Sequence, residues 1–244
     1  MMMTPLFSDL QTRSTGFLSQ ITQEDSLIPG AVLVSASYDE TAFSDALFAR
    51  LDISQPATLS RVIPRRKAEF LAGRAMAQAA MACLGLPPRP VDTTPNRAPL
   101  WPEGLSGSIS HARGRCACLL SQDTGHSFGI DTEAIADGRS LSAILSQTLS
   151  ADERALLTQG PYPPNTNATL TFSAKEALFK ALYPQVGHHF GFDAAILTEA
   201  PGQTSLILAL TTDLTGTLPQ GSRFDIYHRQ TGTHVLTWLS VPNP

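Results

Sequence analysis

Three acidic side chains in this 244-residue chain have the types and the spacing that would suit a metal ion. Asp131 and Glu133 stand two positions apart in the segment GIDTE, which reads as part of a strand, so both side chains emerge on one face. Two carboxylates crowded on one face repel each other unless a cation or water lies between them. For this pair alone, the solvated end of a strand remains an equally good interpretation.

Glu176 supplies a third carboxylate from a helix predicted at TFSAKEALFKAL. Ser173 and Glu176 have the spacing of a capping box, which predicts that the helix begins here, and Glu176 precedes Lys180 in the favourable order for an ion pair. At about 100° per residue, Glu176 and Lys180 share a face that points away from the core together with Lys175. Three acids beside a phosphate ligand would suit magnesium, and the lysines would suit the phosphate charge.

The elements that must position these residues are a mixture of helices and strands. The segment from Pro64 to Leu84 is rich in alanine, has proline in its first turn and is followed by Gly85, so it predicts a long helix. Gly73 inside this helix indicates that something packs closely against its backbone. Strands are predicted at 30–39, on both sides of the turn 112–115, around 126–135 and in several runs of the tail 190–241.

Other segments give weaker or purely local signals. Residues 1–27 show little periodicity, and we expect a loosely held arm there. Residues 86–104 hold several prolines, which predicts a loop without regular structure. Ser150 and Glu153 form a second capping box and predict another helix start.

Composition and charge indicate a folded globular protein of ordinary type. Apolar residues make up 42% of the chain and the net charge is -4, which argues against sequence-independent nucleic-acid binding, because such binding needs a surplus of cations. Cys83, Cys116 and Cys118 form neither an even framework nor a CxxC pair, so they read as small core residues of a reduced compartment. Without a leader-like start or a run of about 18 apolar residues, we expect a monomeric cytoplasmic protein with no transmembrane segment.

Basic residues gather upstream of the acidic trio. Five of the seventeen lysines and arginines fall within fourteen residues, namely Arg61, Arg65, Arg66, Lys67 and Arg74. A solvated helix face and an anion site both explain such a cluster.

Taken together, these motifs resemble the 4′-phosphopantetheinyl transferase superfamily. The family signature, G-[IV]-D-x-E followed by [FW]-S-x-K-E-x-x-x-K, is matched by GIDTE and FSAKEALFK. The siderophore-synthesis subgroup, typified by enterobactin synthase component D, is similar at RRKAEFLAGR, NRAPLWPEGLSGSISH and SADERALL. Thr132 stands where the family usually has isoleucine or valine; it faces opposite the acids, so we expect it to alter packing rather than chemistry.

The resemblance implies an α+β fold of two similar halves packed as a pseudo-dimer, with coenzyme A bound in the cleft between them. We place the N-terminal half at residues 1–121 and the C-terminal half at 122–244. The implied activity is Mg²⁺-dependent transfer of 4′-phosphopantetheine from coenzyme A to a serine hydroxyl of an apo acyl, peptidyl or aryl carrier protein, with release of 3′,5′-ADP.

The resemblance also assigns roles in the C-terminal half. Asp131, Glu133 and Glu176 match the magnesium-binding acids, while Lys175 and Lys180 match lysines that face the pyrophosphate. Glu176 would also take the proton of the attacking serine, and Lys175 would protonate or shield the leaving phosphate.

In the N-terminal half, the implied roles concern binding of the coenzyme. Ser110 and His111 match a Ser-His pair near the adenosine 3′-phosphate, although a lone histidine at a strand end is more often structural. The places of basic coenzyme-binding residues fall on Arg66, Arg74 and Arg97.

Alternatives to a transferase remain open from the residues alone. The acidic trio alone would also support a metal-dependent phosphodiesterase or pyrophosphatase, and the basic cluster would suit a non-catalytic module that binds coenzyme A or a carrier. Arg113 and Arg115, in the turn after His111, would suit docking of an acidic carrier protein, or they form a solvated turn.

Overall fold

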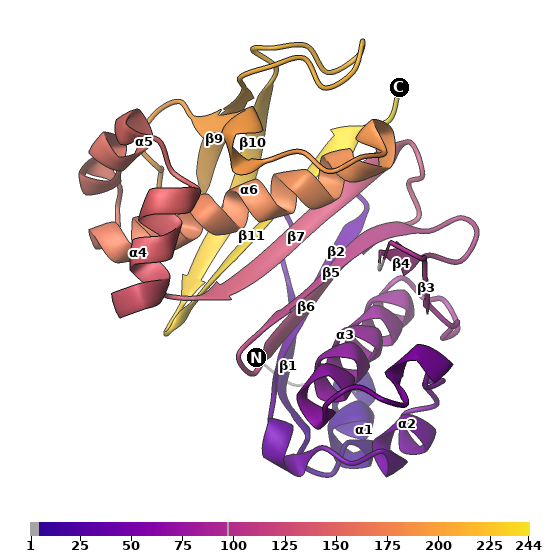
Figure 1. Cartoon of the computed structure of the whole chain (residues 1–244). Coiled ribbons are helices and arrows are strands. Elements are labelled where there is room, and N and C mark those ends of the chain that lie inside the picture. The colour runs from indigo at the N-terminus through magenta and orange to yellow at the C-terminus, as the bar shows by residue number, and fades with distance from the viewer. Residues whose placement is uncertain (1–4, 97) are drawn as a thin grey trace. The chain divides into compact units, whose positions relative to one another are not determined.

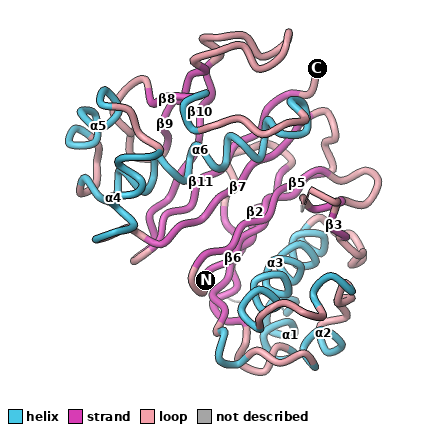
Figure 2. The backbone as a smooth tube through the Cα atoms, in the orientation of Figure 1, coloured by secondary structure: helices cyan, strands magenta, loops and turns pink. Residues whose placement is uncertain are grey.

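The computed structural model describes residues 5–96 and 98–244. It divides into two compact units, the first ending at Thr124 and the second beginning at Gly125. Each unit is an antiparallel sheet with a long helix packed against one face (Figure 1 and Figure 2). The predicted α+β class with two sheet-containing halves is therefore confirmed. None of the described helices is both long and apolar enough to cross a membrane.

The first unit is built on a four-stranded sheet of order β1-β2-β6-β5. Its strands are β1 (Leu18–Glu24), β2 (Ala31–Tyr38), β5 (Ser106–Ala112) and β6 (Arg115–Ser121). The long helix is α3 (Pro64–Cys83), as predicted, and most of its alanines, together with Leu71, are buried in the core of this unit. A Cβ on Gly73 would lie 2.8 Å from a methyl group of Ile109, so the predicted close packing at this glycine is confirmed.

The start of the described chain is part of this unit's core. The chain forms α1 (Pro5–Arg13) before β1, and Phe7, Phe17 and Leu18 are almost fully buried. The prediction of a loose arm is therefore wrong for the described residues. The pattern escapes a period search because α1 is short and β1 carries an irregularity in its register between Ser19 and Thr22.

The connections of the first unit include short helices and one small ladder. The helical pieces are η1 (Glu40–Ala42), α2 (Ala46–Arg50) and η2 (Ala57–Leu59). In the proline-rich segment, β3 (Asp92–Thr93) pairs with β4 (Pro99–Leu100), so the expectation of no regular structure there is wrong at these four residues. Arg113 and Gly114 close the β5–β6 hairpin with φ of 39° and 80°, the left-handed geometry that suits a two-residue turn.

The second unit is built on a five-stranded sheet of order β7-β11-β10-β9-β8. Its strands are β7 (His126–Ala134), β8 (Ala195–Leu197), β9 (Ser205–Leu210), β10 (Arg223–Thr231) and β11 (His234–Pro242). Its helices are α4 (Gly138–Gln147), α5 (Ala151–Leu156), η3 (Leu157–Gln159), α6 (Pro164–Val186) and η4 (Phe192–Ala194). The strands predicted in the tail are confirmed.

Two details of the helices in this unit matter for the site. The predicted capping box of Ser150 and Glu153 opens α5. The predicted helix start at Ser173 is wrong, because α6 begins nine residues earlier, at Pro164.

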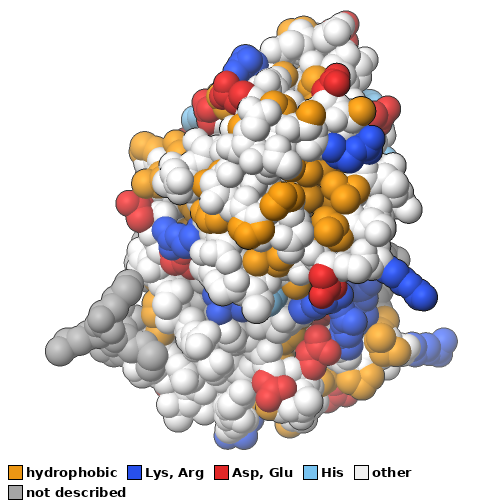
Figure 3. All heavy atoms as spheres, turned by 90° about the vertical axis from the view of Figure 1, so that its left-hand side faces the viewer, with side chains coloured by type: hydrophobic (Ala, Val, Ile, Leu, Met, Phe, Trp, Pro, Cys, Tyr) orange, Lys and Arg blue, Asp and Glu red, His pale blue; other side chains and the backbone are white. Residues whose placement is uncertain are grey.

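Leu141 and Leu145 of α4 are only partly buried, and apolar side chains gather at the surface on the side of α4 and α5 (Figure 3).

Helix α6 crosses β7 at a glycine. A Cβ on Gly129 would overlap the backbone carbonyl of Ala177, so only glycine allows the helix to lie this close to the strand. Leu170, Ala174 and Leu178 are buried in the same interface. The close approach sets how near side chains of β7 and α6 can come to each other two residues further along the strand.

The cysteines belong to the apolar interior of the first unit. Cys116 and Cys118 are fully buried on β6, and Cys83 is half-buried at the end of α3. Burial raises the pKa of the Cys116 thiol to about 12 and also raises that of Cys118. Both thiols therefore stay protonated and pack as small apolar groups, as expected from the sequence.

Candidate functional site

Strand β7 directs its acidic residues toward α6. Asp131 is almost fully buried and accepts a hydrogen bond from Ser173 of α6, with 2.8 Å between Oγ and Oδ2. Glu133, two residues on, shares that face of the strand and is half-buried. Thr132 lies between them and donates its hydroxyl to the backbone oxygen of Val235 on β11, at 3.0 Å. The threonine therefore serves the packing of the sheet, as the alternation predicts.

Two residues of α6 fix the Asp131 carboxylate. Ser173 holds Oδ2, and Lys180 Nζ lies 2.8 Å from Oδ1. Lys180 also donates to the backbone oxygen of Ile130, at 2.9 Å. Ser173, which the spacing predicts to be a helix cap, sits mid-helix, where its hydroxyl joins α6 to β7. A cation and a hydroxyl thus hold one acid in a defined orientation.

Glu176 lies close enough to Asp131 for the negative charge of Asp131 to affect its ionisation. It is half-buried on α6, and its pKa is raised, first by burial and then by the negative charge of Asp131. Lys180 and His189 oppose this shift but do not cancel it. Asp131 and Glu176 are therefore near enough to repel each other, which leaves an excess of negative charge for a cation to relieve.

The donor set fits a hard divalent cation. Mg²⁺ prefers carboxylate oxygens and often takes only one or two carboxylates together with phosphate oxygens. Asp131 and Glu176 offer such oxygens, and their mutual repulsion is the cost that a bound cation would remove. Within the described ranges, no three His, Cys, Asp or Glu side chains already stand in a ligating arrangement. Any metal site here would need substrate oxygens to complete it.

Lys175, the residue before Glu176, is directed elsewhere. Its side chain is almost fully buried, and Nζ lies 2.8 Å from Oε1 of Glu153. The ammonium also donates to the backbone oxygens of Thr148, at 2.9 Å, and Phe192, at 3.1 Å. Burial lowers its pKa, and Glu153 opposes that shift. The expectation that Lys175 points away from the core is wrong, because a buried carboxylate that the helical wheel does not contain faces it.

A pocket that the sequence does not predict opens beside Glu176. Lys175 and Glu176 line it from α6, and Gly191 and Phe192 line it from the segment before β8. Its remaining wall is largely aromatic, contributed by Phe179, His189 and Phe190. The only available signal is the aromatic-rich segment HHFGF directly after α6. Such a wall suits the uncharged part of a ligand whose charged part lies at the acids.

In the first unit, a buried acid gathers the basic residues. Glu69 of α3 is almost fully buried, and its two oxygens accept hydrogen bonds from Arg65 and Arg66, each at 2.9 Å. His111 Nδ1 lies 4.0 Å from Oε2 of the same carboxylate. Ser110, the preceding residue on β5, is buried. Glu69 thus brings two predicted coenzyme-binding residues, Arg66 and His111, into one cluster, and only its helical spacing to the arginines could have revealed it.

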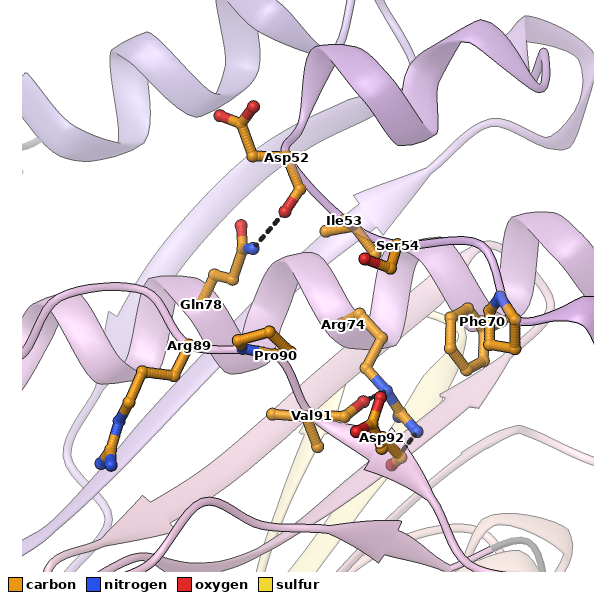
Figure 4. Close-up of a pocket in the computed structure, with 11 residues that line it drawn as sticks. Asp52, Ile53, Ser54, Phe70, Arg74, Gln78, Arg89, Pro90, Val91 and Asp92 are labelled. Atoms are coloured by element: carbon orange, nitrogen blue, oxygen red, sulfur yellow. Dashed lines mark hydrogen bonds between the residues drawn. The ribbon is translucent and has the colours of Figure 1, made fainter.

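Arg74 does not join that cluster. Its guanidinium donates to the backbone oxygens of Val91, at 2.6 Å, and Asp92, at 3.1 Å (Figure 4), and also to Thr93 Oγ1. It stacks over the ring of Phe70, and burial lowers its pKa to about 10. Arg74 therefore ties the segment of β3 to α3 and lines a polar pocket there. Arg97, another predicted coenzyme-binding residue, lies outside the described residues.

Two family models match the chain, and together they span most of it. The 4′-phosphopantetheinyl transferase N-terminal domain matches residues 55–121. The 4′-phosphopantetheinyl transferase superfamily matches residues 127–235, a range that contains Asp131, Glu133 and Glu176.

Curated relatives are named for the same activity. The chain is 36% identical to 4′-phosphopantetheinyl transferase Svp of Streptomyces mobaraensis over 70% of this chain and 71% of that protein. It is 31% identical to 4′-phosphopantetheinyl transferase PptT of Mycobacterium tuberculosis over 68% and 77%, respectively. It is 37% identical to enterobactin synthase component D of Salmonella typhi over 55% of each chain.

Proposed function

This chain belongs to the 4′-phosphopantetheinyl transferase superfamily, whose members move 4′-phosphopantetheine from coenzyme A to carrier proteins, and we propose that here Asp131, Glu133 and Glu176 serve the reaction as ligands of Mg²⁺. The observation that carries the proposal is that β7 and α6 bring Asp131 and Glu176 together, with Ser173 of α6 bonded to Asp131; burial and then the charge of Asp131 raise the pKa of Glu176. A cation that binds together with the substrate would relieve the repulsion between these two carboxylates and so lower the free energy of the complex.

The residues around the acids suit a phosphoryl transfer. A bound Mg²⁺ would offset the charge that builds on the pyrophosphate as 3′,5′-ADP leaves. Lys180 orients Asp131 through its contact at 2.8 Å, and its positive charge lies beside the acids, where it suits the same phosphates. Glu176, whose pKa is raised by burial and by the charge of Asp131, is suited to accept the proton of the attacking serine hydroxyl.

The basic cluster of the first unit suits the 3′-phosphate of coenzyme A. We assign Arg66, Ser110 and His111 to that group, with Glu69 orienting the arginine. Guanidinium groups held by a carboxylate lose little freedom when they bind a phosphate, so the cluster is prepared for an anion.

The role of Arg66 predicts a change in discrimination between two substrates. Arg66→Gln should raise the KM for coenzyme A about tenfold, the value of one charge-assisted hydrogen bond, and should leave the KM for 3′-dephospho-coenzyme A unchanged. Steady-state kinetics with both substrates measures this. Arg61→Gln removes an equally exposed charge from the same region and should change neither KM. An equal rise for both substrates would contradict the assignment.

The function is tested by mass spectrometry of a carrier protein. The protein, Mg²⁺, coenzyme A and an apo carrier are incubated together, and the carrier should gain the mass of one phosphopantetheinyl group. Chelation with EDTA should stop the reaction, and added Mg²⁺ should restore it. Loss of coenzyme A without any gain in carrier mass would instead indicate a phosphodiesterase. Carriers of siderophore and peptide synthesis are the first to test, because one relative is named for enterobactin synthesis.

A further inference from the structure

We propose that Lys175 and Glu153 form a positioning pair that holds the wall of the pocket beside Glu176 and that Lys175 makes no contact with the reacting phosphates. The inference rests on the proposed function, since it concerns the same site. It assigns Lys175 a role different from the phosphate-facing one that its place in the motif implies.

The partners of Lys175 account for its whole donor capacity. An ammonium group carries three N–H bonds, and the structure supplies three acceptors within 3.1 Å: Oε1 of Glu153 and the backbone oxygens of Thr148 and Phe192. The side chain is only 3% exposed. To reach a phosphate, Lys175 would have to give up at least one of these bonds and leave a buried acceptor unsatisfied.

Glu153 is equally committed to the fold. Its Oε2 accepts from the backbone N–H of Ser150, at 2.8 Å, and its Oε1 accepts from the backbone N–H of Leu197, at 2.9 Å. Its side chain is 1% exposed. Together with Lys175, the pair therefore joins the start of α5, strand β8 and helix α6 at one point.

The pair lies directly behind the pocket. Lys175 precedes Glu176 on α6, and the carbonyl it binds belongs to Phe192, which lines the pocket with Gly191. The rings of Phe172 and Phe192 also contact each other, with centroids 5.5 Å apart. Through Lys175, the segment that forms one pocket wall is tied to the helix that presents Glu176, so the pair determines the spacing between them.

A double-mutant cycle separates positioning from direct catalysis. Lys175→Met should lower both kcat and the unfolding midpoint, because it leaves the charge of Glu153 buried without a cation. Adding Glu153→Gln removes that charge and keeps the side-chain volume. The double variant should regain at least about tenfold in kcat over the single variant and should bind coenzyme A within about threefold of wild type by calorimetry. Lys67→Met, which breaks the more exposed pair with Asp45, serves as the control and should change little.

The outcomes decide between the two roles. If Lys175 acts on the phosphates, Glu153→Gln cannot restore the rate, and coenzyme A affinity falls in the double variant as well. Either result would overturn the proposal, and so would a double variant that remains as unstable as Lys175→Met. If Lys175→Met alone does not fold, recovery of folding in the double variant supports the pair. A wild-type chain that modifies no carrier would count against the transferase function, while the coupling in unfolding midpoints would still test the pair.

Discussion

Glu176→Gln is expected to abolish carrier modification and, at the same time, to make the metal-free protein more stable at neutral pH. The loss of activity follows because one carboxylate would serve both as a magnesium ligand and as the acceptor of the serine proton. Removing it should lower kcat about 10³-fold or more, since loss of one electrostatic contact in a desolvated site already costs about 10²- to 10³-fold. The gain in stability follows from the pKa of this residue.

The pH dependence of that gain has a definite sign. The folded-state pKa of Glu176 lies above its unfolded value, because burial and the charge of Asp131 both oppose ionisation. Its contribution to the free energy of unfolding is therefore fully present below the unfolded pKa of about 4.3, and this contribution is lost as the pH rises through the folded-state pKa. Glutamine does not ionise and avoids this loss. The variant should exceed wild type in Tm at pH 7.5 and lose its advantage near pH 4.

Thermal unfolding in EDTA at the two pH values measures the effect. Glu199→Gln, at an exposed position of the same unit, should leave Tm and activity near those of wild type. Added Mg²⁺ with 3′,5′-ADP should raise the Tm of wild type and not that of Glu176→Gln. If the variant is less stable than wild type in EDTA at pH 7.5, ionised Glu176 does not destabilise the folded protein. If the variant retains activity, Glu176 is neither a required metal ligand nor the proton acceptor.

Gly129→Ala is expected to disrupt the second unit. The added Cβ would overlap the carbonyl of Ala177, which is backbone and cannot move without displacing α6 from β7. We expect a loss of about 3 kcal/mol or more in the free energy of unfolding, the upper range for overpacking a core. Activity should fall further than stability alone explains, because the same shift would separate Glu176 from Asp131.

Urea unfolding followed by tryptophan fluorescence measures this loss. Trp238 is buried on β11 and pairs with Ile130, on the face of the sheet opposite α6, so in a Trp101→Phe background its emission reports on unfolding of the second unit. Gly216→Ala is the matched control, because a Cβ there meets nothing within 4 Å, and it should shift stability by less than about 1 kcal/mol. Equal stability of the two variants would mean that the interface tolerates a wider spacing.

Much of the fold could be predicted where a local pattern agrees with the tertiary packing. The alanine-rich composition of α3 and the glycine at its centre predict both a helix and a close neighbour, and Ile109 is that neighbour. Side chains alternate between the two faces of any strand. The sequence alone therefore places Thr132 on the opposite face of β7 from Asp131 and Glu133. In each case the informative residues lie in one element.

The sequence is misleading where the partner comes from another element. Ser173 and Glu176 have the spacing of a cap, but the apolar and threonine-rich stretch before them continues the helix back to Pro164, and the serine bonds Asp131 instead. The wheel places Lys175 with the polar residues, since it cannot include Glu153 from α5. The same limit hides the approach of His111 to Glu69, because the histidine comes from β5 and the acid from α3.

The placement of the three cysteines has a practical consequence for experiments on the two units. All three thiols precede Thr124, and burial raises the pKa of each; Cys116 and Cys118 are fully buried, so alkylating reagents should reach these two only when the first unit opens, while half-buried Cys83 should react earlier. Alkylation of Cys116 and Cys118 would therefore follow opening of that unit alone, while Trp238, in the Trp101→Phe background, follows the second. One substitution thus gives separate probes of the two halves without any added label.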